Sequence, residues 1–185
     1  LADPSRALKE NMDAPALNVR LPDAPCVEQR PRVTPPFADL AAASRAIGHT
    51  LLTHDADGVV RRIAPIVQIG ERTIASVSMA TVMVAGTTPA MDVERAADGQ
   101  CSALIAWRGP AENANGQPTF TSYSFYDLFY SQQQILEGLK PGIDPSLFKD
   151  RIVIVGANAE GLHEVFKTPF PTGEINGPEV HADVI

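Results

Sequence analysis

The run Arg151-Ile152-Val153-Ile154-Val155, closed by Gly156, is the strongest strand signal in the chain. An unbroken series of β-branched residues is typical of a strand that is buried on both faces in a central sheet. We therefore predict an α/β fold with a mixed, mainly parallel central sheet flanked by helices.

Size and charge restrict the class of protein. The chain has 185 residues, 44% of them apolar, which suits a single domain of ordinary size over residues 1–185 with enough material for its own core. Its 15 basic and 22 acidic residues give a formal charge of −7 with no long run of either sign, so we expect no nucleic-acid partner.

No stretch of the sequence reaches the ~18–20 apolar residues of a membrane span. The start, Leu1 to Pro4, is neither an initiator methionine nor a signal peptide, so we expect an N-terminally truncated piece of a longer protein.

The two cysteines leave two alternatives open. Cys26 and Cys101 cannot hold a metal alone, and no nearby pair of histidines completes a site, so we predict no metal and no cofactor. They could form one disulfide or remain two separate buried thiols, because sequence separation does not define the Cα distance that a disulfide requires.

The N-terminal third divides at a proline-rich connection over residues 22–36, which should lie on the surface without regular structure. Before it we predict a helix capped by Asp3 and a strand over 17–21. After it we predict a short helix from Pro36 to Ala46.

Two strands, over 47–53 and 59–69, should then form a β-hairpin around Asp55 to Gly58. The later elements are expected to be a helix over 76–85 ended by Gly86, a loop over 87–100, a strand over 101–107, a helix over 126–139 and a C-terminal helix from Pro178. Phe125, Phe129 and Tyr130 form an aromatic face on the fourth of these, which we assign to the core.

The segment after the predicted central strand has partial matches to nucleotide-binding loops. Gly156 and Gly161 have phosphate-loop spacing, but Leu162 and His163 occupy the positions that need lysine and serine or threonine. Asn158 likewise replaces the glycine that lets a dinucleotide approach the backbone. We therefore interpret the segment as a tight turn in which Asn158 satisfies backbone groups.

The Asp55-x-Asp57-Gly58 motif favours a hairpin turn over a calcium loop, because Ile66 stands where the closing glutamate would be. An Asp-Gly pair tolerates the positive φ of such turns. Arg61 and Arg62 then lie on opposite faces of the next strand. We expect the inward one to form a buried bridge with Asp57 or Asp55, with anion binding as the alternative.

Catalytic motifs are absent from the sequence. His163-Glu164 lacks the second histidine of a zinc-protease helix, and there is neither a Gly-x-Ser-x-Gly elbow nor a Cys-His pair of the catalytic type. We expect no enzymatic activity in this chain. His181 lies on an apolar helix face and is interpreted as a hydrogen-bonded core residue.

Several motifs in series resemble a known family, the CHASE domains of type two. They are Asp55-x-Asp57-Gly58-Val59-x-Arg61-Arg62-x-x-Pro65, Lys149-x-Arg151-Ile152-Val153-Ile154-Val155-Gly156, Ala159-x-Gly161-Leu162, Thr168-Pro169 and Gly177-x-Glu179-Val180-His181-Ala182. The order and spacing match from about Phe37 to the end. The chain departs from the family pattern at Glu164, where an aspartate is usual.

The resemblance implies an extracytoplasmic sensory domain of a bacterial transmembrane receptor. Flanking membrane helices would tether a soluble domain to the periplasmic face of the inner membrane. The full-length protein would be an adenylate or guanylate cyclase, a histidine kinase or a serine/threonine kinase, and would form a homodimer. The signal would be an unknown small molecule or a physical stimulus. The alternative is a structural or dimerisation module without a ligand.

Open α/β sheets place ligands beyond the carboxyl ends of their strands. We therefore predict ligand contacts at Asn158, Glu164 and Thr168. A structural or motif role is predicted for Asp55, Asp57, Gly58, Arg61, Arg62, Gly156, Gly161, Pro169 and His181.

Overall fold

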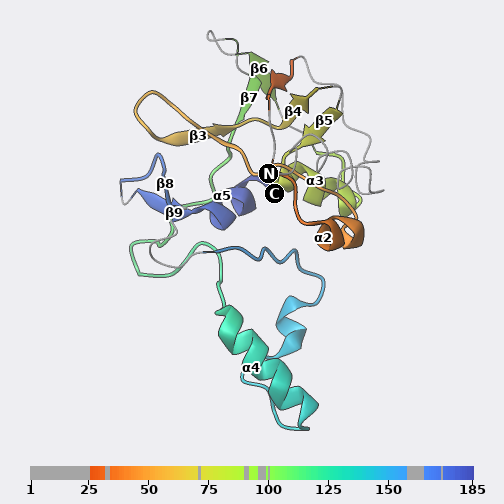
Figure 1. Ribbon diagram of the computed structural model, residues 1–185. Coiled ribbons are helices and arrows are strands. Elements are labelled where there is room, and N and C mark those ends of the chain that lie inside the picture. The colour runs from red at the N-terminus through yellow and green to blue at the C-terminus, as the bar shows by residue number, and fades with distance from the viewer. Residues whose placement is uncertain are drawn as a thin grey trace.

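The computed structural model describes residues 26–31, 34–70, 72–89, 92–95, 99, 101–157, 165–171 and 173–185. Figure 1 shows small sheets and helices packed together, with α4 extending away from them. The sheets have the strand orders β1-β4-β5, β2-β3-β7-β6 and β8-β9. The strands are β1 (Glu28–Gln29), β2 (Leu52–His54), β3 (Val60–Ile63), β4 (Ile66–Ile69), β5 (Arg72–Ala75), β6 (Val93–Arg95), β7 (Cys101–Leu104), β8 (Val165–Lys167) and β9 (Glu174–Asn176). The helices are α2 (Ala38–Ala43), α3 (Val77–Val84), α4 (Phe125–Leu136) and α5 (Gly177–Val184), with a 3₁₀ turn at Pro145–Phe148.

The α/β composition is confirmed, but the predicted mainly parallel central sheet is wrong. Among the named strands of the described residues, β1 and β4 pair in parallel, and every other pair is antiparallel. Antiparallel neighbours can be joined by tight turns and need no helical crossover. The chain therefore builds several small sheets in place of one large one.

The predicted hairpin is confirmed. β2 pairs with β3 across the turn that Gly58 closes by donating its N–H to the Asp55 carbonyl at 2.8 Å. Gly58 has a φ of +78°, a conformation that favours glycine. The second predicted strand is interrupted at Pro65, and its two halves, β3 and β4, enter different sheets. Proline has no N–H to donate, which explains why the ladder breaks there.

Three of the predicted helices are confirmed: α2 and α3 have shorter bounds than predicted, and α5 begins at Gly177, one residue earlier than predicted. Ser76 caps α3 by accepting a hydrogen bond from the Met79 N–H at 3.2 Å, and Gly86 follows the helix end with a φ of +87°. The expected loop over 87–100 contains β6, and the predicted proline-rich connection contains β1. The helix and strand predicted before residue 22 lie outside the described residues.

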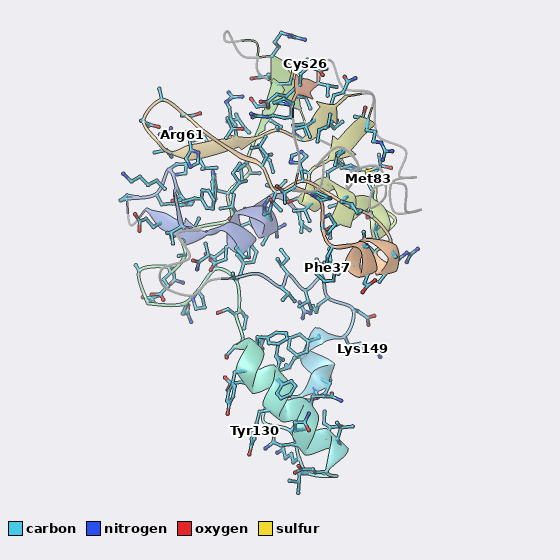
Figure 2. All side chains as sticks on the ribbon, in the orientation of Figure 1. Cys26, Phe37, Arg61, Met83, Tyr130 and Lys149 are labelled. Carbon is cyan, nitrogen blue, oxygen red and sulfur yellow. A yellow bond between two sulfur atoms is a disulfide. The ribbon has the colours of Figure 1, made fainter. Side chains whose placement is uncertain are left out.

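Helix α4 is present where the sequence predicts a helix, although it spans Phe125–Leu136 and not residues 126–139, and its aromatic face is not part of the core. Phe125, Phe129 and Tyr130 are 70%, 58% and 56% exposed. Figure 2 shows Tyr130 on the part of α4 that is distant from the sheets. The helical spacing of the apolar residues correctly predicted a helix here. The prediction that its aromatic face packs into the core is wrong.

The strand predicted over Arg151 to Val155 is also wrong. Residues 151–157 carry no strand pairing, and Ile152, Val153 and Val155 are 50%, 51% and 76% exposed. A β-branched run favours an extended backbone, but burial requires neighbouring strands that this fold does not supply there. The segment instead connects the 3₁₀ turn to the region before β8.

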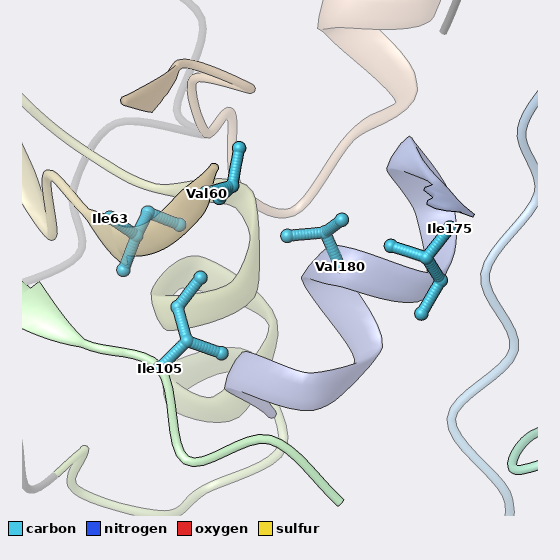
Figure 3. Packing of buried hydrophobic residues seen from close by; sticks show 5 residues of the cluster. All are labelled: Val60, Ile63, Ile105, Ile175 and Val180. Carbon is cyan, nitrogen blue, oxygen red and sulfur yellow. The ribbon is translucent and has the colours of Figure 1, made fainter. Parts of the chain in front are cut away.

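The core lies where the four-stranded sheet meets α5 and β9. Val60, Ile63, Ile105, Ile175 and Val180 form one buried cluster, shown in Figure 3. Two further clusters cover the faces of β4 and β5, and one of them includes Met79 and Ala80 of α3. The C-terminal helix is therefore built into the main core.

Cys26 and Cys101 form a disulfide, with their Cα atoms 5.7 Å apart and a sequence separation of 75. This settles the alternative left open by the sequence. Cys101 belongs to β7, and Cys26 lies two residues before β1, so the bond links two sheets. Closing a loop of this length restricts the unfolded chain and stabilises the native one by roughly 4 kcal/mol in the chain-entropy account.

Removing the disulfide should lower the melting temperature by about 10 °C, because roughly 4 kcal/mol shifts a domain of this size by that order. We would replace both cysteines by alanine and measure thermal unfolding by circular dichroism. Reductant should lower the melting temperature of the unmodified chain and leave that of the double variant unchanged. Equal sensitivity of both proteins to reductant would contradict the expectation.

Candidate functional site: the docking of the C-terminal helix

Helix α5 presents one buried stripe to the rest of the fold. It begins at Gly177 with Pro178 in its first turn, where a missing N–H loses no helical hydrogen bond. Gly177, Val180 and His181 are buried and have the i, i+3, i+4 spacing of a single helix face. Val180 is fully buried against the sheet cluster, so α5 is held by apolar contact on one part of this face.

Polar contact holds the next position of that face. Ser78 on α3 is buried, and its Oγ donates to the His181 carbonyl oxygen at 3.0 Å and lies 3.2 Å from His181 Nδ1. Because the hydroxyl has one proton and gives it to the carbonyl, Nδ1 must carry a proton and donate it to Oγ. One serine therefore binds both the backbone and the ring of His181. We call this pair the Ser78–His181 contact.

His49 lies beside this contact at the start of α3. Its N–H donates to the Ala75 carbonyl at 2.9 Å, and its carbonyl accepts from the Val77 N–H at 2.8 Å. A Cβ on the preceding Gly48 would lie 2.4 Å from the Val77 Cα, so the backbone passes very close to the helix. These constraints fix the position from which the imidazole of His49 extends.

The imidazole of His49 is held in its neutral form. Its Nδ1 accepts from the Leu51 N–H at 3.2 Å, so the ring proton is on Nε2, which is buried without a hydrogen-bond partner among the described residues. Burial, followed by the charges of His181 and Arg30, lowers the pKa of His49 from 6.5 to about 4. Arg30 itself forms an ion pair with Glu28.

Acidic groups on α5 are also buried. The Asp183 carboxylate accepts from the backbone N–H of Arg108 at 2.7 Å through Oδ1, while Oδ2 is buried without a partner among the described residues. Burial raises the pKa of Asp183, and burial also raises the pKa of Glu179. Helix α5 thus carries an imidazole and two carboxyl groups on the faces that contact the rest of the fold.

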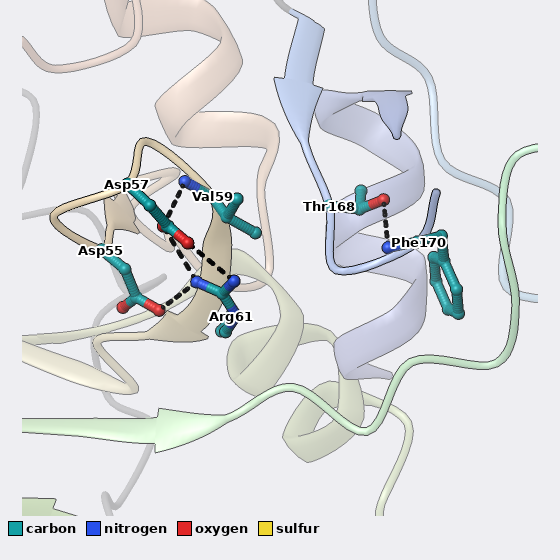
Figure 4. Close-up of polar contacts among 6 residues, drawn as sticks. All are labelled: Asp55, Asp57, Val59, Arg61, Thr168 and Phe170. Atoms are coloured by element: carbon teal, nitrogen blue, oxygen red, sulfur yellow. Dashed lines mark hydrogen bonds and ion pairs between the residues drawn. The ribbon is translucent and has the colours of Figure 1, made fainter. Parts of the chain in front are cut away.

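The predicted arginine–aspartate bridge forms at the hairpin, although it is not buried. Arg61 Nη1 donates to Asp55 Oδ2 at 2.7 Å and Arg61 Nη2 donates to Asp57 Oδ2 at 2.8 Å, as Figure 4 shows. The hydrogen bond from Arg61 is the main cause that lowers the pKa of Asp57, to about 2. Arg62 points elsewhere and lies 3.4 Å from Glu94.

Replacing Arg61 by glutamine should raise the pKa of Asp57 from about 2 towards its ordinary value of 3.8, because the charged donor is lost. A carboxyl-detected NMR titration would measure the change. Arg62→Gln is the matched control and should leave Asp57 unaltered. An unchanged Asp57 titration in Arg61→Gln would show that the ion pair does not form in solution.

Thr168 lies close to this hairpin. Val59 forms a parallel bridge with Lys167, which places the end of β8 beside the start of β3. Thr168 itself is buried, donates its N–H to the Gly173 carbonyl at 2.7 Å and accepts from the Phe170 N–H at 3.4 Å. Figure 4 shows this turn. These contacts shape the β8–β9 connection, and the ligand role of Thr168 stays a prediction.

The other predicted positions are partly described. A Cβ on Gly156 would lie 2.3 Å from Pro178 Cγ, so this glycine lies directly against the first turn of α5. Pro169 is exposed. Asn158, Gly161 and Glu164 lie outside the described residues. His181 is buried and hydrogen-bonded, as predicted.

Sequence reasoning missed His49, Ser78 and Asp183. Ser78 follows the capping serine by two residues and reads as part of an apolar helix, and His49 reads as part of a strand. The available signal was His49 directly after Gly48, in the strand predicted over residues 47–53. Its link to His181, far along the chain, depends on tertiary packing.

Two further structural features are absent from the described residues. No helix in the described part of the chain is long and apolar enough to cross a membrane. Within the same residues there is no group of three or more histidine, cysteine, aspartate or glutamate side chains arranged to hold a metal ion.

Comparison with known proteins identifies the family. The CHASE2 domain family matches residues 3–185, which is nearly the whole chain. The chain therefore belongs to the CHASE2 domain family, which consists of extracellular sensory domains of signalling receptors. No curated protein and no solved structure matches the chain.

Proposed function

We propose that this chain is the periplasmic sensory part of a bacterial transmembrane receptor, and that it couples a signal to a cytoplasmic catalytic domain. The output would be an adenylate or guanylate cyclase, a histidine kinase or a serine/threonine kinase. Membership of a family of extracellular sensory domains supports the location. The Cys26–Cys101 disulfide supports it too, because such bonds persist in oxidising compartments.

The observation that carries the proposal is the docking of α5. The buried face of this helix meets α3 through the Ser78–His181 contact and the sheet through Val180. A signal that changes this packing changes the position of the helix. A receptor with two states needs such an element, whose equilibrium the signal biases.

Removing the Ser78 hydroxyl should change receptor output, because it releases both the carbonyl and the ring of His181. In the natural full-length protein we expect Ser78→Ala to shift basal output about fivefold or more, the lower end of typical coupling free energies. Cyclase or kinase activity would be measured in membranes. Ser122→Ala, at an exposed serine, is the control. Normal output from a folded Ser78→Ala receptor would contradict coupling through α5.

A second candidate function, self-association with another copy of the chain, is favoured by α4. Phe125, Tyr126, Phe129 and Tyr130 are each more than half exposed. Aromatic side chains have roughly 150–250 Å² each, so these four leave on the order of 400 Å² of apolar surface open. With Leu136, which is 70% exposed, this surface exceeds half of the ~800 Å² that each partner buries in a standard interface. Apolar patches of this size on soluble proteins are often functional.

The opposite side of α4 is already occupied. Ser131 is buried and accepts from the Ile143 N–H at 3.0 Å, and Gln134 accepts from the Gly142 N–H at 2.8 Å. The following loop therefore folds back on that side and leaves the aromatic side open. A two-fold pairing of two such faces would place the same residues opposite each other.

Placing a charge on this face should weaken association. We expect Phe129→Glu to raise the dimer dissociation constant at least tenfold, because a carboxylate would be buried without a partner. Sedimentation equilibrium would measure it. Leu104→Glu, at another exposed apolar residue outside α4, is the matched control. A chain that is monomeric at every concentration would remove this candidate.

A further inference from the structure

His49 can dock only as a neutral ring. Its Nδ1 accepts the Leu51 N–H, and a protonated imidazole has no acceptor, so protonation would set two donors against each other at 3.2 Å. The second nitrogen offers no compensation, because Nε2 is buried without a hydrogen-bond partner among the described residues. Proton uptake therefore requires the ring, or what covers it, to move.

The charges around His49 act in the same direction. From the residue after β1, the Arg30 guanidinium opposes a second positive charge, although its ion pair with Glu28 moderates it. From α5, His181 also opposes it. From α3, whose sequence VSMATVMV has no ionisable side chain, the described neighbour is the Ser78 hydroxyl, engaged with His181. Among the described residues, no carboxylate directly stabilises a positive charge on the His49 ring.

The geometry points to the proton as a ligand of this domain, bound at His49, whose binding separates α5 from α3. This inference rests on the proposed sensory function and names external acidity as a signal for it. The Ser78–His181 contact is the part that breaks, since His181 meets both Ser78 and the charge on His49.

The sign of the pH dependence follows from the direction of the shift. The docked state holds His49 with a pKa of about 4, whereas an opened state restores the ordinary 6.5. The opened state therefore binds more protons between these values, and docking weakens as the pH falls through that window. Between about pH 7.5 and about pH 5 the opening equilibrium should rise roughly twentyfold.

The acidic groups of α5 have the opposite effect. Because burial raises the pKa of Asp183 and Glu179, the docked state takes up protons on these carboxyls more readily than an opened one. Acid would then strengthen docking through them. A loss of docking in acid thus cannot come from Asp183 or Glu179. The direction of the pH response therefore distinguishes protonation of His49 from protonation of these carboxyls.

Hydrogen exchange of the 185-residue chain tests the proposal. Amide exchange in α5, corrected for the intrinsic effect of pH, should show a roughly twentyfold larger opening equilibrium at about pH 5 than at about pH 7.5. Amides of the β4–β5 hairpin serve as the internal reference. His49→Gln cannot be protonated and should lose this dependence, whereas His54→Gln, outside the cluster, should retain it. Equal α5 protection at both pH values, or the same acid response in His49→Gln, would overturn the proposal.

A direct titration needs no variant. The ring protons of His49 followed by NMR should report a pKa close to 4, and a value near 6.5 would overturn the proposal even if the variants fail to fold. Output of the natural full-length receptor at two external pH values tests the sensory role separately. Unchanged output combined with acid-induced opening of α5 would remove the proposed function and leave the proton site intact.

Discussion

The contact between α3 and α5 is the constraint on which the rest of the structure depends. It joins segments about a hundred residues apart in sequence, and it brings together the start of α3, His49 three residues before β2, and the C-terminal helix. Ser76 caps α3, Ser78 binds α5, and the His49 backbone bridges the strand end to the helix start. Buried hydroxyl and imidazole groups of this kind are costly unless they are satisfied, so they tolerate few alternative packings.

Local elements could be predicted well from sequence. The Asp55–Gly58 turn, the end of α3 before Gly86 and the proline in the first turn of α5 each depend on residues within one or two turns of the chain, and all three are found. A bridge from one of the two arginines to Asp57 or Asp55 was predicted for the same reason, and Arg61 forms it with both aspartates. Its exposure was not predicted, because exposure depends on what the hairpin packs against.

The errors concern tertiary partners. The run from Ile152 to Val155 and the aromatic face of α4 have the composition of buried elements, yet both are exposed in this fold. Apolar periodicity specifies which residues share a face but not which surface covers it. The same limit explains why His181 was recognised as a core residue while His49, which defines its electrostatic surroundings, was not. Of the three residues predicted to contact a ligand, Thr168 can be placed, and its polar groups are used within its own turn.

The position of Gly156 has a mechanical consequence for α5. The absence of a side chain lets the exposed segment that leads from α4 rest on Pro178, with no space for even a methyl group between them. The helix is therefore held at its first turn by the Pro178 ring against Gly156 and in its middle by polar contact at His181. A displacement of the segment that carries Gly156 would press on the first turn of α5, whereas protonation at His49 would act one turn further along the same helix.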